Sequence, residues 1–403
     1  MTEKLNLYVY ILCATILGVA TILTGKSYGE TNQVQLDSII VVLLLIIYIL
    51  AYLLLYHFYY KTQFTIPHIK GFPKFYFTQK IHVLVFSALM FKLFGLLAFN
   101  IGSSERNVTT SFSILFNLVK IEEFFPIYYV VSRKTNNKFY WFNLLVFAVL
   151  RILQGWTGWI LTITILELFL QENEYKGVYI FLSRHSKALL ASIAIISGGL
   201  IYYFAYPLKN YIRFGGNINY YSLSIEGAVY QLVSRMTSFP VFTAMIQYGK
   251  KTIQLYRTQG VFLCEFKSLF RPLIPAFIFR NKDFRVITNL ILQAQWPNIS
   301  NETGTNIGLA GYWILLLRCD VADFVFCLAI TLGVLLLIFS IFDAFDDGSH
   351  NVRILYFLQI MAFGLGGSLE ATLSNGYFGA FYMLLILIIF GGVKIGESPQ
   401  SFR

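Results

Sequence analysis

The sequence predicts an all-α polytopic membrane protein with about ten transmembrane helices and one large, partly helical loop outside the bundle. Of its 403 residues, 57% are hydrophobic and only 13% are charged. The mean hydropathy is positive, at +0.65. Apolar runs of roughly 16–25 residues, the length that crosses a bilayer, recur along the chain. Together these observations exclude an ordinary water-soluble domain.

The apolar runs define the expected spans. They lie at about 5–25, 38–59, 82–101, 111–131, 139–154, 156–171, 187–208, 321–342, 353–370 and 376–393. The first run is too long for a signal-peptide core and no small-residue cleavage pattern follows it, so we expect a retained first span. The two runs within 139–171 are expected to turn at Gly155-Trp156-Thr157-Gly158, because a single helix would reach roughly 48 Å, more than a bilayer needs.

The basic residues of the short loops orient these spans. With ten spans and a cytoplasmic N-terminus, the outer short loops hold only Lys26 and Arg106. The inner loops and termini hold Lys4, Lys61, Lys70, Lys74, Lys80, Arg133, Lys134, Lys138, Lys176, Arg184, Lys187, Arg353, Lys394 and Arg403. Because cytoplasmic loops carry the excess of Lys and Arg, both termini are expected in the cytoplasm.

The chain is expected to have three parts. A bundle of spans one to seven occupies 1–208, a basic loop occupies 209–306, and spans eight to ten with a cytoplasmic tail occupy 307–403. The loop carries eleven Lys/Arg against four Asp/Glu, and it falls on the outer face, where basic residues are normally sparse. A basic outer loop calls for an anionic partner.

Short amphipathic helices are expected within this loop. Its apolar runs Val229–Val233, Pro240–Ile246 and Ile287–Leu292 alternate with polar positions. Such patterns are typical of helices that lie on a membrane surface or over a bundle.

The arginines of the loop are the first candidates for chemistry. A guanidinium stays charged and presents a planar fork that matches phosphate oxygens, so these residues suit a lipid-linked pyrophosphate. They could stabilise charge on a departing diphosphate without a metal. The alternative is contact with anionic lipid head groups, worth about 1 kcal/mol each. The set is Arg213, Arg235, Arg257, Arg271, Arg280 and Arg285, with Lys267 and Lys282.

No cofactor, disulfide framework or metal site is expected. The four cysteines, Cys13, Cys264, Cys319 and Cys327, are scattered along the chain without ligand spacing. The formal net charge of +11 does not require a nucleic acid, because membrane orientation explains most of it.

Two further motifs follow the arginines. Leu269–Pro275 places Arg271 beside two prolines, which fix an extended or turning backbone. A basic pair, Arg280 and Lys282, comes next, and the Asn301–Gly308 cluster then enters an apolar helix. Glycines in such a loop let the backbone approach a ligand closely. A structural helix entry with a polar cap explains the last segment equally well.

In this organisation the chain resembles the Wzy-type O-antigen or oligosaccharide repeat-unit polymerases. The shared features are the many-span bundle, the large basic periplasmic loop, Arg271-Pro272, the basic pair Arg280 and Lys282, and the glycines Gly304, Gly308 and Gly311 before a span. The resemblance implies a C-type glycosyltransferase-like fold in the bacterial inner membrane. It also implies an inverting reaction that moves a growing glycan from undecaprenyl pyrophosphate onto a lipid-linked repeat unit at the periplasmic face.

The resemblance also implies partners. They are undecaprenyl-pyrophosphate-linked oligosaccharides and membrane lipids, and the sequence leaves open whether a chain-length-regulating co-polymerase binds. No nucleotide sugar is involved in this chemistry.

For this reaction we expect Arg235 and Arg280 to act on the leaving diphosphate. Glu302 and Glu370 are the preferred bases for the acceptor hydroxyl, ahead of Glu226, Asp320 and Asp323, although each could equally be a solvated or salt-bridged carboxylate. The residues expected to bind substrate are Arg213, Arg271, Lys282, Arg151 and Tyr312.

Charged residues inside the spans form another constellation. Lys92, Lys120, Glu122, Glu123 and Arg151 fall at membrane depth, where charges usually pair or line a polar path. An ion pair between Lys92 and a glutamate of the fourth span is expected, with Arg151 the residue best placed to meet substrate.

The sequence Asp343-Ala344-Phe345-Asp346-Asp347 is similar to the aspartate-rich motifs of membrane prenyltransferases, but those enzymes need two such motifs. A solvated cytoplasmic loop is the better interpretation.

Two other functions remain open at this stage. A flippase or transporter of lipid-linked oligosaccharide would also need basic residues, although flippases keep them in a cavity and have short loops. An O-antigen ligase-like transferase is associated with a histidine in the outer loop. Here all five histidines, His57, His68, His82, His185 and His350, fall on the cytoplasmic side, which favours a polymerase.

Overall fold

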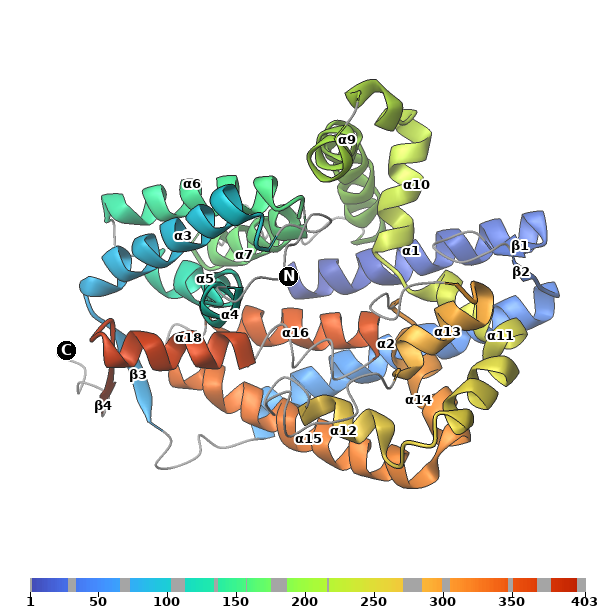
Figure 1. The fold of residues 1–403 in the computed structure, drawn as a ribbon. Helices are drawn as coiled ribbons and strands as arrows, with labels where there is room; N and C mark the ends of the chain where they lie inside the picture. The colour runs from blue at the N-terminus through green and yellow to red at the C-terminus, as the bar shows by residue number, and fades with distance from the viewer. Residues whose placement is uncertain are drawn as a thin grey trace.

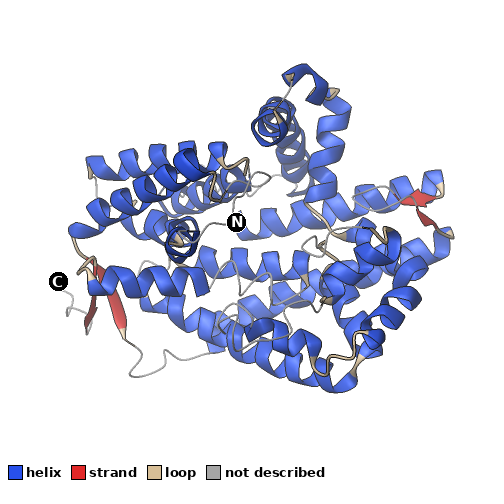
Figure 2. Ribbon diagram, in the orientation of Figure 1, coloured by secondary structure: helices blue, strands red, loops and turns tan. Residues whose placement is uncertain are grey.

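The computed structural model describes residues 2–27, 34–65, 73–102, 113–133, 137–156, 158–174, 187–215, 217–270, 285–298, 305–346, 351–367 and 378–396. Within these ranges the protein is a bundle of α-helices with two short pairs of strands (Figure 1). The strand pairs lie at opposite ends of the molecule (Figure 2). The expected all-α class is therefore confirmed.

The helices and strands have the following bounds. The first half contains α1 (Thr2–Thr24), α2 (Ser38–Thr65), α3 (Lys80–Phe99), α4 (Ser113–Leu118), α5 (Ile121–Ser132), α6 (Lys138–Leu153), α7 (Gly158–Glu174) and α9 (Lys187–Phe214). The second half contains the 3-10 turn η1 (Ile218–Tyr221), α10 (Ile225–Arg235), α11 (Phe239–Thr258), α12 (Cys264–Phe270), α13 (Ile287–Gln295), α14 (Leu309–Cys319), α15 (Val321–Ala344), α16 (Arg353–Gly366) and α18 (Phe378–Ile389). Strand β1 (Lys26–Ser27) pairs with β2 (Val34–Gln35), and β3 (Lys74–Phe77) with β4 (Val393–Gly396), both antiparallel.

Five helices of the described chain are long and apolar enough to cross a membrane. They are Thr2–Thr24, Ser38–Thr62, Lys80–Phe99, Leu189–Phe214 and Val321–Ala344. The other expected spans coincide with shorter helices, such as α6 with 16 residues, α16 with 14 and α5 with 12. Pro126 lies inside α5, where it removes a backbone donor. The structure therefore supports a helical membrane protein.

The turn expected between 139 and 171 is present. Helix α6 ends at Leu153 and α7 begins at Gly158. Gly155, in this turn, has a positive φ of +76°, which residues with a side chain rarely adopt. Two helices rather than one long helix thus occupy this region.

Figure 1 shows two groups of helices, one at each end of the molecule. Helices α3, α5, α6 and α7 gather at the end that carries β3 and β4, whereas α11, α13 and α14 gather at the end near β1 and β2. Helices α1 and α2 pack against each other, and α16 packs against α2. This arrangement brings α2, α11, α14 and α16 together.

The basic segment 209–306 begins within α9 and continues through short helices. Two of the three apolar runs that the sequence singled out lie in short helices, as expected: α10 has 11 residues and α13 has 9. The third run lies in α11, which is longer than expected, at 20 residues. Helix α10 packs against α9 across two glycines. A Cβ at Gly198 would lie 2.9 Å from Leu232 Cδ2, and one at Gly199 would lie 2.4 Å from Val229 Cγ2.

This close packing predicts opposite effects for two helical glycines. Gly199→Ala should lower stability by about 1–3 kcal/mol, because the added methyl group overpacks the α9–α10 contact. Gly333→Ala in α15 meets open space, so it should keep or raise stability through its helix propensity, worth about 1 kcal/mol. Melting temperatures of the purified variants in detergent test this. Equal stabilisation by both would show that α9 and α10 do not pack through Gly199.

Candidate functional site

A small polar pocket lies where four segments meet: the end of α10, the start of α11, the residues before α14 and the end of α16. Its volume is about 100 Å³. The lining residues are Ser234, Arg235, Thr237, Ser238, Pro240, Val241, Asn306 and Leu365. Of the residues expected to be functional, Arg235 is the one that lines this pocket.

Arg235 reaches the pocket because of where α10 stops. The Ser224 side chain accepts a hydrogen bond from Gly227 N (3.0 Å) at the start of α10, and Arg235 is its last residue. The following helix begins at Phe239, with Pro240 in its first turn, which is a favoured place for proline. Arg235 is exposed, and no hydrogen bond or ion pair to its side chain occurs among the described residues.

The hydroxyl group of Tyr48, from α2, holds the turn that lines the pocket. Tyr48 is buried, and its oxygen accepts hydrogen bonds from Thr237 Oγ1 (2.9 Å) and Ser238 N (3.0 Å). It also lies 3.0 Å from Ser238 Oγ and 3.3 Å from the Tyr52 hydroxyl. The turn that presents Arg235 is therefore fixed to a long helix of the bundle.

Two glycines allow the backbone to close around the pocket. Gly308 has a φ of +80°, and a Cβ there would lie 2.5 Å from Ser238 Oγ. Gly367 has a φ of +76°, and its Cβ would lie 2.5 Å from the Gly308 carbonyl oxygen. A side chain at either position would be strained. At Gly308 it would collide with Ser238 and Tyr48, and at Gly367 it would collide with the Gly308 backbone and Tyr312 and so push α16 away from α14. The glycine-bearing segment before α14 thus serves close packing beside the pocket.

Arg151 and Arg213, both expected to bind substrate, converge on a different residue, Trp156. Their guanidinium carbons lie 5.8 and 5.5 Å from the centre of its ring, within the range of cation–π attraction. Arg213 Nε also donates to the Gly155 carbonyl (2.9 Å). These contacts join the α6–α7 turn to the end of α9.

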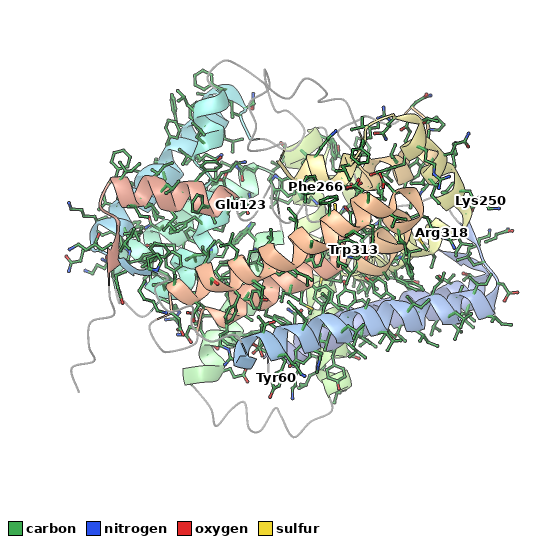
Figure 3. The ribbon with its side chains drawn as sticks, turned by 90° about the horizontal axis from the view of Figure 1, so that it is seen from below. Tyr60, Glu123, Lys250, Phe266, Trp313 and Arg318 are labelled. Carbon is green, nitrogen blue, oxygen red and sulfur yellow. The ribbon has the colours of Figure 1, made fainter. Side chains whose placement is uncertain are left out.

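The ion pair expected at membrane depth is present. Lys92 Nζ lies 3.3 Å from Glu122 Oε1, and both side chains are over 90% buried. Gln154 Nε2 donates to Glu122 Oε1 (3.0 Å), and Arg151 Nη1 donates to Gln154 Oε1 (3.1 Å). Arg151 is therefore linked through Gln154 to the Lys92–Glu122 pair. Figure 3 shows the neighbouring Glu123 within the bundle.

Tyr312, expected to contact a sugar, is buried instead. It is 3% exposed, and its hydroxyl donates to Glu265 Oε2 (2.8 Å). A ring in this position cannot stack on a sugar at the surface, so this expectation is corrected. The reason is that Glu265 is itself buried and needs donors.

A second buried carboxylate, Asp323, lies in the same polar cluster. It accepts hydrogen bonds from Glu265 N and Phe266 N (both 2.8 Å) and from the Tyr256 hydroxyl. Burial, aided by the negative charge of Glu265, raises the pKa of Tyr256, so its phenol stays protonated and donates. The lone pairs of Asp323 are thus engaged in holding α12 to α15, and the alternative of a base at this position is not favoured.

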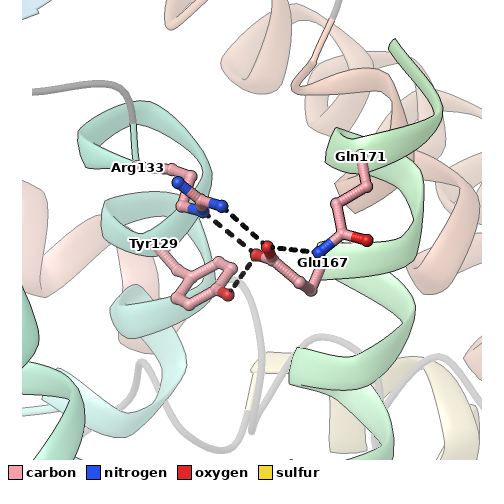
Figure 4. A network of polar contacts seen from close by, with 4 residues as sticks. All are labelled: Tyr129, Arg133, Glu167 and Gln171. Atoms are coloured by element: carbon pink, nitrogen blue, oxygen red, sulfur yellow. Dashed lines mark hydrogen bonds and ion pairs between the residues drawn. The ribbon is translucent and has the colours of Figure 1, made fainter. Parts of the chain in front are cut away.

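Charged groups at the other end of the bundle are also paired. Arg133 donates to Glu167 through Nε (3.1 Å) and Nη2 (2.8 Å), while Tyr129 and Gln171 donate to the same carboxylate (Figure 4). Lys74 Nζ lies 3.4 Å from Asp343 Oδ2. The Asp343 carboxylate of the aspartate-rich sequence is therefore partly used in an ion pair.

The remaining expected site residues, Arg271, Arg280, Lys282, Glu302 and Glu370, lie outside the described residues. Within the described ranges no group of three or more His, Cys, Asp or Glu residues could hold a metal ion. The four cysteines are free and buried.

The sequence reasoning missed Tyr48 and Ser238, and it included Asn306 only as a member of the Asn301–Gly308 cluster. One signal was available for Tyr48: tyrosines recur in α2 at 48, 52, 56 and 59, spacing that places them on one helical face. Ser238 carries no comparable pattern.

Comparison of the chain with protein-family models, with curated proteins and with solved structures finds no match. Its function is therefore argued from its own residues.

The Lys92–Glu122 pair predicts a strong coupling between two substitutions. Lys92→Met or Glu122→Gln alone should each cost about 3–5 kcal/mol, because each leaves a buried partner uncompensated. The double variant should be more stable than the sum of the single effects predicts. Denaturation in detergent, compared with Lys250→Ala as a surface control, measures this. Additive single effects would show that the two side chains do not pair.

Proposed function

We propose that this protein is a membrane-embedded inverting glycosyltransferase that polymerises lipid-linked oligosaccharide repeat units, with Arg235 binding the diphosphate of the donor. The observation that supports this best is the setting of Arg235. Lys74, Lys92 and Arg133 are paired with carboxylates, whereas Arg235 lines a polar pocket with no carboxylate among the lining residues. A guanidinium so placed suits an anionic ligand.

The size of the pocket allows a phosphate group. Its volume of about 100 Å³ is well above the roughly 10–15 Å³ that one bound water needs by the same measure. The glycan would then extend outward from Arg235, and the lipid would lie along the bundle.

The chemistry follows from this placement. The acceptor hydroxyl attacks the anomeric carbon of the donor sugar, and the bond from that carbon to the diphosphate oxygen breaks with inversion. Negative charge grows on the leaving diphosphate, where Arg235 would stabilise it. The acceptor proton passes to a carboxylate, for which Glu302 and Glu370 remain our candidates.

The proposal includes a topology. We place ten spans in the bacterial inner membrane, the 209–306 segment in the periplasm and both termini in the cytoplasm. The charge distribution of the short loops supports this. Lys74 and Arg133, assigned to the cytoplasm, belong to β3 and the end of α5, which lie at the same end of the structure in Figure 1.

Reporter fusions test the topology. Alkaline phosphatase fused after Asn281 should be active because it is exported, and the same enzyme fused after Arg403 should be inactive. A cytoplasmic reporter at each position should give the reverse pattern. An inactive phosphatase at Asn281 would place the basic segment in the cytoplasm and end the polymerase proposal.

The deletion phenotype separates the alternatives. Loss of a polymerase leaves single repeat units on the lipopolysaccharide core, loss of a flippase leaves none, and loss of a ligase leaves polymer unattached. A lipopolysaccharide gel of the deletion strain distinguishes these results, and we expect single repeat units.

Arg235 should be required for polymerisation. Arg235→Ala should lower the rate by about 10²–10³, equivalent to about 3–4 kcal/mol of lost transition-state stabilisation. Arg235→Lys should rescue poorly, because an ammonium lacks the bidentate fork. The measurement is glycan ladder length in cells with matched protein levels.

The control for this experiment is Lys250→Ala. Lys250 is exposed on α11 at the edge of the molecule (Figure 3) and does not line the pocket. It should leave the ladder unchanged. Wild-type ladders from Arg235→Ala would remove Arg235 from the reaction.

A further inference from the structure

The hydroxyl groups of the pocket differ in how their hydrogens are used. Ser234 Oγ donates to the Gln231 carbonyl (2.9 Å), and Thr237 Oγ1 donates to the Tyr48 hydroxyl (2.9 Å). Thr237 Oγ1 also accepts from Phe239 N (3.2 Å). The hydrogens of Ser234 and Thr237 are therefore engaged within the protein. Among the described residues, the Tyr48 hydroxyl at 3.0 Å is the only hydrogen-bond partner of Ser238 Oγ.

The direction of that contact follows from the capacity of Tyr48. A phenol oxygen has two lone pairs and one hydrogen. Thr237 Oγ1 and Ser238 N already donate to this oxygen, so both lone pairs are occupied. Tyr48 donates its one hydrogen to the Tyr52 oxygen at 3.3 Å. With both lone pairs occupied, the oxygen of Tyr48 is also a poor acceptor for the Ser238 hydroxyl, which lies 3.0 Å away.

The Ser238 hydrogen must consequently point elsewhere, and the pocket is the open direction. Gly308 keeps that space clear, because a Cβ at this position would lie 2.5 Å from Ser238 Oγ. Asn306, the residue two positions earlier, also lines the pocket and carries two amide hydrogens. Arg235 provides the positive charge beside them.

We infer that Tyr48 is a positioning residue: it holds Ser238 through the amide and leaves the Ser238 hydroxyl hydrogen free to donate to a phosphate group bound at Arg235. The phosphate identity rests on the proposed function, whereas the donor direction rests on the hydrogen bonds of Tyr48. Phosphate oxygens only accept hydrogen bonds, so a site for them benefits from a hydroxyl whose hydrogen has no acceptor within the protein. Tyr48 fixes that hydroxyl from outside the pocket by accepting from the Ser238 amide.

The test uses the full-length protein in nanodiscs and farnesyl diphosphate as the probe, with farnesol as the uncharged control. Ser238→Ala and Tyr48→Phe should each weaken diphosphate binding about tenfold, the size expected for a hydrogen bond to a charged group. The double variant should bind no more weakly than Ser238→Ala alone, because Tyr48 acts through Ser238. Farnesol binding should not change.

Tyr52→Phe is the matched control. It removes a neighbouring buried phenol hydroxyl. Tyr52 makes no hydrogen bond to Ser238 among the described residues, so diphosphate affinity should stay within about twofold. Melting temperatures are recorded for every variant, and binding is measured where all are folded. A purely structural role for Tyr48 would lower the melting temperature and leave the affinity unchanged, which would overturn the inference.

Other outcomes are also decisive. If Arg235→Ala weakens diphosphate binding but Ser238→Ala does not, the inference fails while the proposed function stands. Additive losses from Tyr48→Phe and Ser238→Ala would likewise show that Tyr48 does not act through Ser238. If the wild type does not distinguish farnesyl diphosphate from farnesol, both the inference and the diphosphate assignment fail.

Discussion

A polar group inside an apolar bundle must be paired, and the Tyr48 hydroxyl is where this constraint organises the molecule. Leaving such a group unpaired costs about 1–3 kcal/mol. Tyr48 sits on α2, yet its partners Thr237 and Ser238 belong to the turn between α10 and α11. The buried amide of Ser238 and the hydroxyl of Thr237 both need an acceptor, and Tyr48 provides it. These bonds fix the turn between α10 and α11 to the core. The position of Arg235 follows from this attachment.

The same constraint sorts the charges of the protein. Lys92 pairs with Glu122, Arg133 with Glu167 and Lys74 with Asp343. The buried carboxylates Glu265 and Asp323 are satisfied by amides and phenols. These groups hold helices together, and their local charge is compensated or hydrogen-bonded. Arg235 differs because the residues that line the pocket with it are hydroxyls, an amide and apolar groups, which leaves its charge without a carboxylate partner in the pocket.

The sequence predicted those features that depend on local pattern. The helix that ends at Arg235 was predictable because an apolar run precedes a proline, and the Lys92 pair because an unpaired charge at membrane depth is costly. The roles of Tyr48 and Tyr312 were not predictable, since both depend on which distant segment packs against the ring. Tyr312 meets Glu265, 47 residues earlier, and Tyr48 meets Ser238, 190 residues later. No periodicity encodes such a pairing, which only the assembled bundle creates. The length of α5 escaped prediction for a similar reason, because Phe116, which precedes α5 and lies in the separate helix α4, is still buried in the bundle.

The pairing of β3 with β4 has a consequence for the order in which the protein is made. Lys74 pairs with Gly396 and Phe77 with Val393, and Thr78 N adds a hydrogen bond to the Gly392 carbonyl (3.1 Å). Strand β3 is synthesised early, and its partner β4 emerges only after most of the chain has been translated. Until then β3 remains an unpaired edge, which is the kind of surface that invites mispairing. This end of the bundle is therefore completed late in folding, through a contact between distant parts of the chain. The step must wait for the synthesis of β4, even if the helices around β3 have already formed.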